Sequence, residues 1–148
     1  MIRPRRARTD DTEIIRLIKS ELMPLSFSTS PRDAQTIREL PIRLRSGTTF
    51  VVSRTKTSTP LGFVHLYTQG GTLLYDMLAV HPQHRGKKLG TKLMAYGEAY
   101  ARKQECTTAR LFVDYSNNDA QRLYTRLGFR ANRDFPELRC FEMVKSLT

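Results

Sequence analysis

One stretch constrains this chain most: an apolar run that passes directly into a basic loop and then into a helix. Residues 73–80 are nearly all apolar, which predicts a central strand covered on both faces. The loop HPQHRGKKLG occupies residues 81–90, and apolar residues then recur at helical spacing as far as residue 103. The unpaired amides and positive dipole end of a helix that starts there favour an anionic ligand such as a diphosphate. The loop matches neither the P-loop nor the Rossmann glycine pattern, and by itself it could equally be an ordinary basic turn.

The rest of the chain predicts a single α+β domain over residues 1–148, built around one mixed central sheet that is flanked by helices. The expected order is β-α-α-β-β-β-α-β-α-β-β, without repeats or linkers. Strands and later helices follow from alternating or continuous apolar runs between turn residues. We expect strands at 2–8 (an edge strand), 49–52, 61–67, 73–80, 109–113, 129 and 141–144, and helices at 90–103 and 120–127.

Two further helices are expected between the first two strands. Asp10 or Asp11 is placed to cap the first helix, and Pro24 is expected to end it. Residues 30–31 are Ser-Pro, a favourable helix start, and the second helix is expected to stop before Pro41.

Charge and composition exclude several classes of protein. The chain carries 25 Lys and Arg against 14 Asp and Glu, a net charge of +11, but it has no block of like charges that would form a basic tail. No apolar run is long enough to span a membrane, and the basic N-terminus has no apolar segment after it, so we expect a cytoplasmic protein. Cys106 and Cys140 are expected to be small core residues, and His81 and His84 lack a third ligand for a metal.

The segment after the expected strand at 109–113 carries a second motif. Asn117, Ala120, Tyr124 and then Gly128-Phe129 fall at the spacing of the closing motif of the GNAT superfamily of N-acetyltransferases, which this segment resembles. The loop Arg85–Gly90 resembles the same family's acetyl-CoA pyrophosphate motif. The two motifs occur in the family's order, and the resemblance covers the whole chain. One position departs from the pattern: the usual glycine is Lys88, which is costly if that residue needs a positive φ.

The resemblance implies a GNAT-like fold and an acetyl-CoA-dependent N-acetyltransferase that acts on a primary amine by direct transfer in a ternary complex, without a metal. Tyr124 would be the general acid that protonates the departing thiolate, and the Leu78 N–H would stabilise the oxyanion. Asn117 would bind the cofactor, cap a helix, or do both. The implied cofactor-binding residues are Leu78, Ala79, Val80, Arg85, Gly86, Lys87, Lys88, Leu89, Gly90, Asn117 and Tyr124.

The general base is less well defined. Strict alternation along the strand predicts that Asp76 shares a face with Leu78 and Val80, whereas Tyr75 and Met77 share the other face. On that basis Asp76 is the favoured base.

Asp114, His65 and bulk water remain alternative routes for the acceptor's proton. The acceptor is expected to contact residues 22–45, whose mixed apolar and basic character favours an amine on a neutral or acidic small molecule, or a peptide end.

Two other functions stay open: a basic nucleic-acid-binding module, which we rank low because no aromatics flank the arginine clusters, and a non-catalytic acyl-CoA-binding protein. The resemblance also allows a homodimer.

Overall fold

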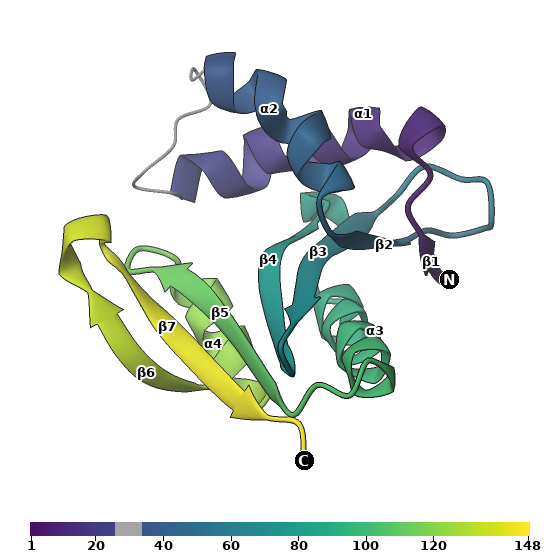
Figure 1. Cartoon of the computed structure of the whole chain (residues 1–148). Helices are drawn as coiled ribbons and strands as arrows, with labels where there is room; N and C mark the ends of the chain where they lie inside the picture. Colours follow the sequence, from purple (N-terminus) through teal and green to yellow (C-terminus); the bar gives the residue numbers. More distant parts are fainter. Residues whose placement is uncertain (26–33) are drawn as a thin grey trace.

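The computed structural model describes residues 1–25 and 34–148, which form one seven-stranded sheet with helices on both faces (Figure 1). The strand order is β1-β2-β3-β4-β5-β7-β6. All neighbouring strands are antiparallel except β4 and β5, so the predicted mixed sheet and the α+β class are confirmed. The elements are β1 (Ile2–Pro4), α1 (Ala7–Leu17), a π-helix η1 (Ile18–Leu22), η2 (Met23–Leu25), α2 (Ala34–Arg45), β2 (Thr48–Val52), β3 (Gly62–Gln69), β4 (Thr72–Val80), η3 (Pro82–His84), α3 (Leu89–Lys103), β5 (Thr108–Asp114), α4 (Asn118–Arg126), β6 (Arg130–Phe135), η4 (Pro136–Leu138) and β7 (Cys140–Ser146).

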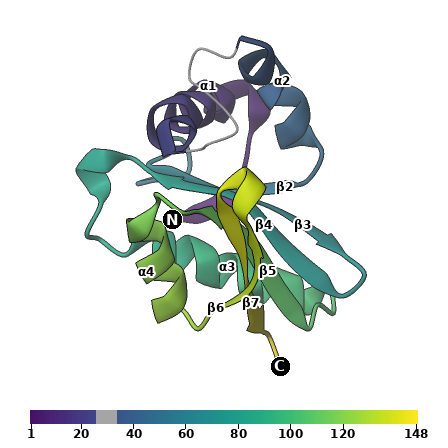
Figure 2. The ribbon, with the colours of Figure 1, turned by 90° about the vertical axis from the view of Figure 1, so that its left-hand side faces the viewer.

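The sheet separates two apolar clusters. Helices α1 and α2 cover one face of β2–β4, and their buried side chains include Ile14 and Leu44, both fully inaccessible to solvent. Helices α3 and α4 lie against the other face, as the rotated view shows (Figure 2), around Leu93 and Leu111. This packing on both faces explains why the strand at 72–80 is so apolar in sequence.

The first helical segment differs from the prediction at both ends. It begins at Ala7, and Asp10 lies inside its first turn, where the carboxylate accepts a hydrogen bond from the Arg6 N–H at 2.8 Å. The segment then continues through the π-helix η1 into η2, which contains Pro24. Because Pro24 lies at the end of this continuous helical segment, its missing amide hydrogen costs one hydrogen bond of the last turn and interrupts no further helix.

The predicted end of the second helix before Pro41 is wrong. Helix α2 runs through Pro41 to Arg45, although proline removes one helical hydrogen bond. Leu40 and Leu44, on either side of it, are 2% and 0% exposed, so their burial against the sheet outweighs the lost bond. The expected start at residues 30–31 lies outside the described residues.

Strands β4 and β5 pair over only part of their length. The parallel ladder joins Thr72–Tyr75 to Thr108–Leu111, and beyond it both strands continue without pairing to each other. The sheet therefore divides into a wedge-shaped opening between the two strands (Figure 1). It is this opening that positions the functional site.

A β-bulge lies at the point where the two strands part. His65 pairs with Met77 and Leu66 pairs with Tyr75, so Asp76 is an additional residue without a partner on β3. The bulge resets the alternation: Tyr75 belongs to the cluster beneath α3, whereas Met77 belongs to the cluster beneath α1 and α2.

The predicted facing of Asp76 is consequently wrong. Leu78 and Val80 pack toward the α3 cluster, but the Asp76 carboxylate lies on the α2 side, where it contacts Arg43. Strict alternation could not locate the bulge, because nothing in the local sequence marks it.

Candidate active site

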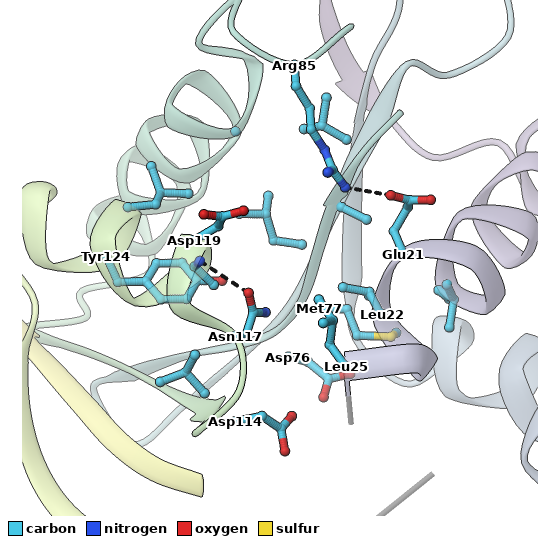
Figure 3. Close-up of a pocket in the computed structure, with 18 of the residues that line it drawn as sticks. Glu21, Leu22, Leu25, Asp76, Met77, Arg85, Asp114, Asn117, Asp119 and Tyr124 are labelled. Carbon is cyan, nitrogen blue, oxygen red and sulfur yellow. Dashed lines mark hydrogen bonds and ion pairs between the residues drawn. The ribbon is translucent and has the colours of Figure 1, made fainter. Parts of the chain in front are cut away.

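The wedge between β4 and β5 opens into a pocket of about 650 Å³. Its walls are the end of the first helical segment and α2 on one side, and β5 and α4 on the other, with β4 between them (Figure 3). The predicted cofactor-binding residues line this one pocket, apart from Lys87, and so does Asp76.

The exposed edge of β4 offers unpaired backbone groups. The His81 N–H donates to the Leu61 carbonyl at 2.8 Å, which fixes the register with β3. Since backbone groups alternate in direction along a strand, the N–H and C=O of Leu78 and Val80 point away from β3, into the wedge. Those of Ala79 point toward β3. An extended ligand that carries amide groups can pair with Leu78 and Val80 as a short strand would.

The loop that follows β4 has the geometry of an anion site. Gly86 has φ +81°, a conformation that side chains rarely adopt, and Lys88, the N-cap of α3, has φ 61°. These residues form the turn that leads into the N-terminus of α3, where the first amides of the helix lack partners within the helix and favour an anion. Lys88 therefore does occupy a left-handed conformation, at a cost of roughly 1–2 kcal/mol relative to glycine.

On the opposite wall, α4 carries Tyr124. Its ring meets Phe129 edge-on at 6.0 Å between centroids, and burial raises the pKa of its hydroxyl to about 12. The phenol therefore keeps its proton near neutral pH and has that proton to donate. Asn117 caps α4, because its Oδ1 accepts the Ala120 N–H at 3.2 Å (Figure 3).

Asp76 lies at the end of the pocket where β4 and β5 part. Arg43 donates two hydrogen bonds to its carboxylate, from Nη2 to Oδ1 at 2.6 Å and from Nε to Oδ2 at 3.0 Å. His65 Nε2 lies 3.7 Å from Oδ2 on the inner side. Asp114 also lines the pocket, from the end of β5, whereas His65 is completely buried.

Some charged residues of the pocket were not singled out from the sequence, and Glu21 is the one that contacts the loop after β4. Glu21, on the π-helix η1, accepts a hydrogen bond from Arg85 Nη2 at 2.5 Å, across the mouth of the pocket (Figure 3). The sequence carries no signal for this contact, because a π-helical turn shifts the facing of the residues within it.

Part of the expected acceptor region takes part in the pocket. Leu22, Met23 and Leu25 come from the end of the first helical segment, and Leu40 and Arg43 come from α2. The expected region 22–45 also includes residues 26–33, which lie outside the described residues.

Within residues 1–25 and 34–148, no helix is long and apolar enough to cross a membrane. The same residues contain no group of three or more His, Cys, Asp or Glu that could hold a metal ion.

The fold and both motifs find their match in one family. The family model described as acetyltransferase (GNAT) family aligns with residues 13–129, which is most of the chain. The chain belongs to the GNAT acetyltransferase family. The resemblance inferred from the two motifs is thereby confirmed, and with it acetyl-CoA-dependent acetylation at the level of the family.

Two curated relatives are also acetyltransferases. The GNAT chain is 40% identical over 63 residues to acetyltransferase Atu2258 of Agrobacterium fabrum, and 45% identical over 53 residues to mycothiol acetyltransferase of Stackebrandtia nassauensis. These alignments cover 43% and 36% of this chain, and only 44% and 17% of the relatives. The chain therefore matches less than half the length of either protein.

Among solved structures, the GNAT chain is similar to PaiA N-acetyltransferase from Thermoplasma acidophilum, which was crystallised in complex with coenzyme A. The TM-score is 0.80 at 20% identity, and the match covers 99% of this chain and 98% of the other. At that identity the likeness is one of fold.

Proposed function

We propose that this GNAT protein is an N-acetyltransferase that moves the acetyl group of acetyl-CoA directly to a primary amine while both substrates are bound. One observation carries the proposal: the Tyr124 hydroxyl, the open edge of β4 and the amide-lined loop at residues 86–90 all border the same pocket. A direct transfer needs these three parts on one surface, since the donor must lie extended between an anion site and a proton donor.

The donor would lie along β4. Its diphosphate would bind the amides of residues 86–90, with Arg85, Lys87 and Lys88 adding positive charge, and its pantetheine amides would pair with Leu78 and Val80. This placement agrees with the directions of the backbone groups at the open edge. It would bring the thioester to the deep end of the wedge, where β4 and β5 part.

The reaction then needs two proton transfers: the attacking amine must lose a proton, and the departing thiolate must gain one. The amine nitrogen attacks the thioester carbon, and the Leu78 N–H stabilises the negative oxygen that forms. As the C–S bond breaks, the Tyr124 hydroxyl donates its proton to the departing sulfur.

Asp76 would take the proton that the amine must lose. It lies at the end of the wedge and accepts through oxygens that Arg43 holds in place. Asp114 lines the same pocket, and bulk water is a further route, so the assignment to Asp76 is tested separately below.

The acceptor would be a primary amine on a small molecule or a peptide. The side of the pocket that faces it combines apolar residues with the Arg43–Asp76 ion pair. Arg43 offsets the negative charge of Asp76, so this carboxylate offers a polycationic amine little attraction.

The proposal is tested first by calorimetric titration with acetyl-CoA and then by an assay of thiol release over a panel of primary amines. We expect micromolar binding of acetyl-CoA and release of free CoA thiol that depends on one class of amine. Binding without thiol release for any amine would instead favour a non-catalytic acyl-CoA-binding protein. No binding of acetyl-CoA would refute the proposal.

A further inference from the structure

A fully buried histidine lies directly beneath the deep end of the pocket. His65, on β3, is 0% exposed, and its Nδ1 lies 2.7 Å from the Thr49 hydroxyl on β2. Its other nitrogen, Nε2, has no hydrogen-bond partner among the described residues. A buried polar atom without a partner is costly and uncommon in folded proteins, so its surroundings call for a physical account.

The bulge in β4 brings Asp76 to this histidine. Because Asp76 is the additional residue opposite the step from His65 to Leu66, its carboxylate lies next to the imidazole, with Oδ2 3.7 Å from Nε2. This separation is too long for a hydrogen bond, but it places the dipole of the imidazole within the field of the carboxylate. The carboxylate thus has Arg43 on its outer side and His65 on its inner side.

The ring's tautomer follows from these neighbours. If Nδ1 carried the proton, the lone pair of Nε2 would face a negative carboxylate inside the protein. If the Thr49 hydroxyl donates to Nδ1 instead, the proton is on Nε2 and points at Asp76, which is the favourable arrangement.

We propose that His65 is a positioning residue, which directs its Nε2–H at Asp76 and keeps that carboxylate oriented for the proton transfer from the acceptor. This inference rests on the proposed function, because it affects the rate only if Asp76 is the base. His65 itself would not touch the acceptor, since it is fully buried and does not line the pocket.

The charged groups around His65 agree with a neutral ring. Burial lowers the pKa of His65, the charge of Asp76 raises it, the charges of Arg43 and Arg5 lower it, and the backbone of Arg43, which accepts from the ring, raises it; Arg5 is itself paired with Asp11. The Tyr67 ring, 5.0 Å away, adds no charge at neutral pH. The net effect is a pKa below the ordinary value, so the ring remains a neutral donor.

Nuclear magnetic resonance of the imidazole nitrogens tests the coupling without any acceptor. We expect wild-type His65 to carry its proton on Nε2, and its pKa to fall further in Asp76→Asn because the attractive negative charge is lost. A proton on Nδ1, or an identical pKa in both proteins, would overturn the inference.

The dependence of rate on pH tests the catalytic part. A donor aimed at a carboxylate favours its ionised form, so loss of that donor in His65→Leu should move the acidic limb of kcat/KM to higher pH. On that limb we expect about a tenfold loss, with recovery toward the wild-type rate at high pH and an unchanged Kd for acetyl-CoA. His65→Gln, which can return an N–H near the position of Nε2, should restore part of the shift.

Phe63→Leu is the matched control. Phe63 lies two residues earlier on β3, packs in the cluster beneath α1 and α2, and is equally buried. It should lower the melting temperature without moving the acidic limb. If Phe63→Leu and His65→Leu lower the rate equally at all pH values, His65 is merely structural and the inference fails.

Failure of the two proposals can be told apart. If the wild type releases no thiol with any amine, the proposed function fails, while the imidazole titration still decides whether His65 and Asp76 are coupled. If the wild type is active and the acidic limb is the same in His65→Leu, the positioning role fails and the transferase function stands.

Discussion

Tyr124 is the residue whose chemistry depends most on its burial. Burial raises the pKa of its hydroxyl to about 12, so deprotonation of Tyr124 should not limit the rate at any pH below about 11. We expect Tyr124→Phe to lower kcat by about tenfold or more, the range of general-acid effects, with little change in KM for acetyl-CoA. Steady-state kinetics with the active amine measures this.

The control for Tyr124→Phe is Tyr96→Phe, which removes a phenol from the exposed side of α3, where Tyr96 is 40% exposed. It should leave both kinetic constants unchanged. An unaltered kcat in Tyr124→Phe would remove this residue as the acid.

Gly86 is a second residue whose role follows from local geometry. At φ +81° any side chain is strained, so Gly86→Val should turn the loop amides away from the diphosphate and weaken acetyl-CoA binding by about tenfold. Gly70→Val supplies a matched comparison, because Gly70 has φ +57° in the turn between β3 and β4, away from the pocket. Titration calorimetry on both variants separates loss of the site from general strain: equal affinities would refute the loop assignment.

At the scale of elements, the contact between η1 and the loop after β4 links the helical wall of the pocket to the candidate anion site. Arg85 is bound to Glu21 at the place where it would meet a phosphate, so the two anions compete for one guanidinium. We expect Glu21→Gln to tighten acetyl-CoA binding by about two- to fivefold, since Arg85 is 57% exposed and the pair is worth roughly 1 kcal/mol or less.

The comparison for Glu21→Gln is Glu137→Gln, which makes the same change in net charge on exposed η4, away from the pocket. Titrations at one ionic strength should show tighter binding in the first variant alone. Equal changes in both would mean that overall charge, and not the contact with Arg85, sets the affinity.

The sequence predicted the elements wherever a pattern was local. The apolar run at 73–80 and the helical spacing after residue 90 gave β4 and α3 to within a residue or two. The passage of α2 through Pro41 could not be predicted, since burial of residues distant in sequence overrides the local preference of proline. The bulge at Asp76 was missed for the same reason: it is a property of two paired strands.

The candidate site likewise has parts that a local sequence pattern predicts and parts that depend on residues distant in sequence. Both motifs, each of which is contiguous in sequence, supply residues to one pocket: Tyr124 lines it, and so do the residues of the loop at 85–90 apart from Lys87. The facing of Asp76 and the contribution of Glu21 depend on a bulge and on a π-helical turn, and neither leaves a residue pattern.

Across the whole molecule, many basic side chains form ion pairs with acidic ones. Arg3 binds Asp10, Arg43 binds Asp76 and Lys145 binds Glu98, so many cations already have anionic partners despite the net charge of +11. The excess of cations that remains is spread along the sequence and does not form a block of like charges.

Stability should fall as the pH drops below about 6.5, because of His65. Its pKa lies below the ordinary 6.5 in the folded protein, chiefly through burial, so the unfolded chain binds a proton first as the pH falls. The stabilisation is therefore fully present above pH 6.5 and is lost progressively below it. Burial raises the pKa of Asp10, but the hydrogen bonds from Arg3 and from the Arg6 amide lower it further, so its pKa in the folded protein lies below the ordinary value of 3.8. Protonation of Asp10 therefore lowers the stability further only below about pH 3.8.

Urea unfolding at pH 7.5, 6.5 and 5.5 measures this dependence. The free energy of unfolding should decline between the last two values in the wild type and decline less in His65→Gln. An identical slope in the two proteins would show that other groups govern the dependence.

The short ladder between β4 and β5 has a mechanical consequence. Four residue pairs, Thr72–Tyr75 with Thr108–Leu111, are the direct strand-to-strand connection between one half of the sheet and the other. A donor that pairs with Leu78 and Val80 would continue the line of backbone pairing beyond this ladder. The bound ligand would then bridge two halves of the sheet that few backbone pairs of the chain itself connect. Substrate binding and cohesion of the fold would be the same event, so the enzyme would be most rigid while it is loaded and loosest in the interval between product release and the next donor.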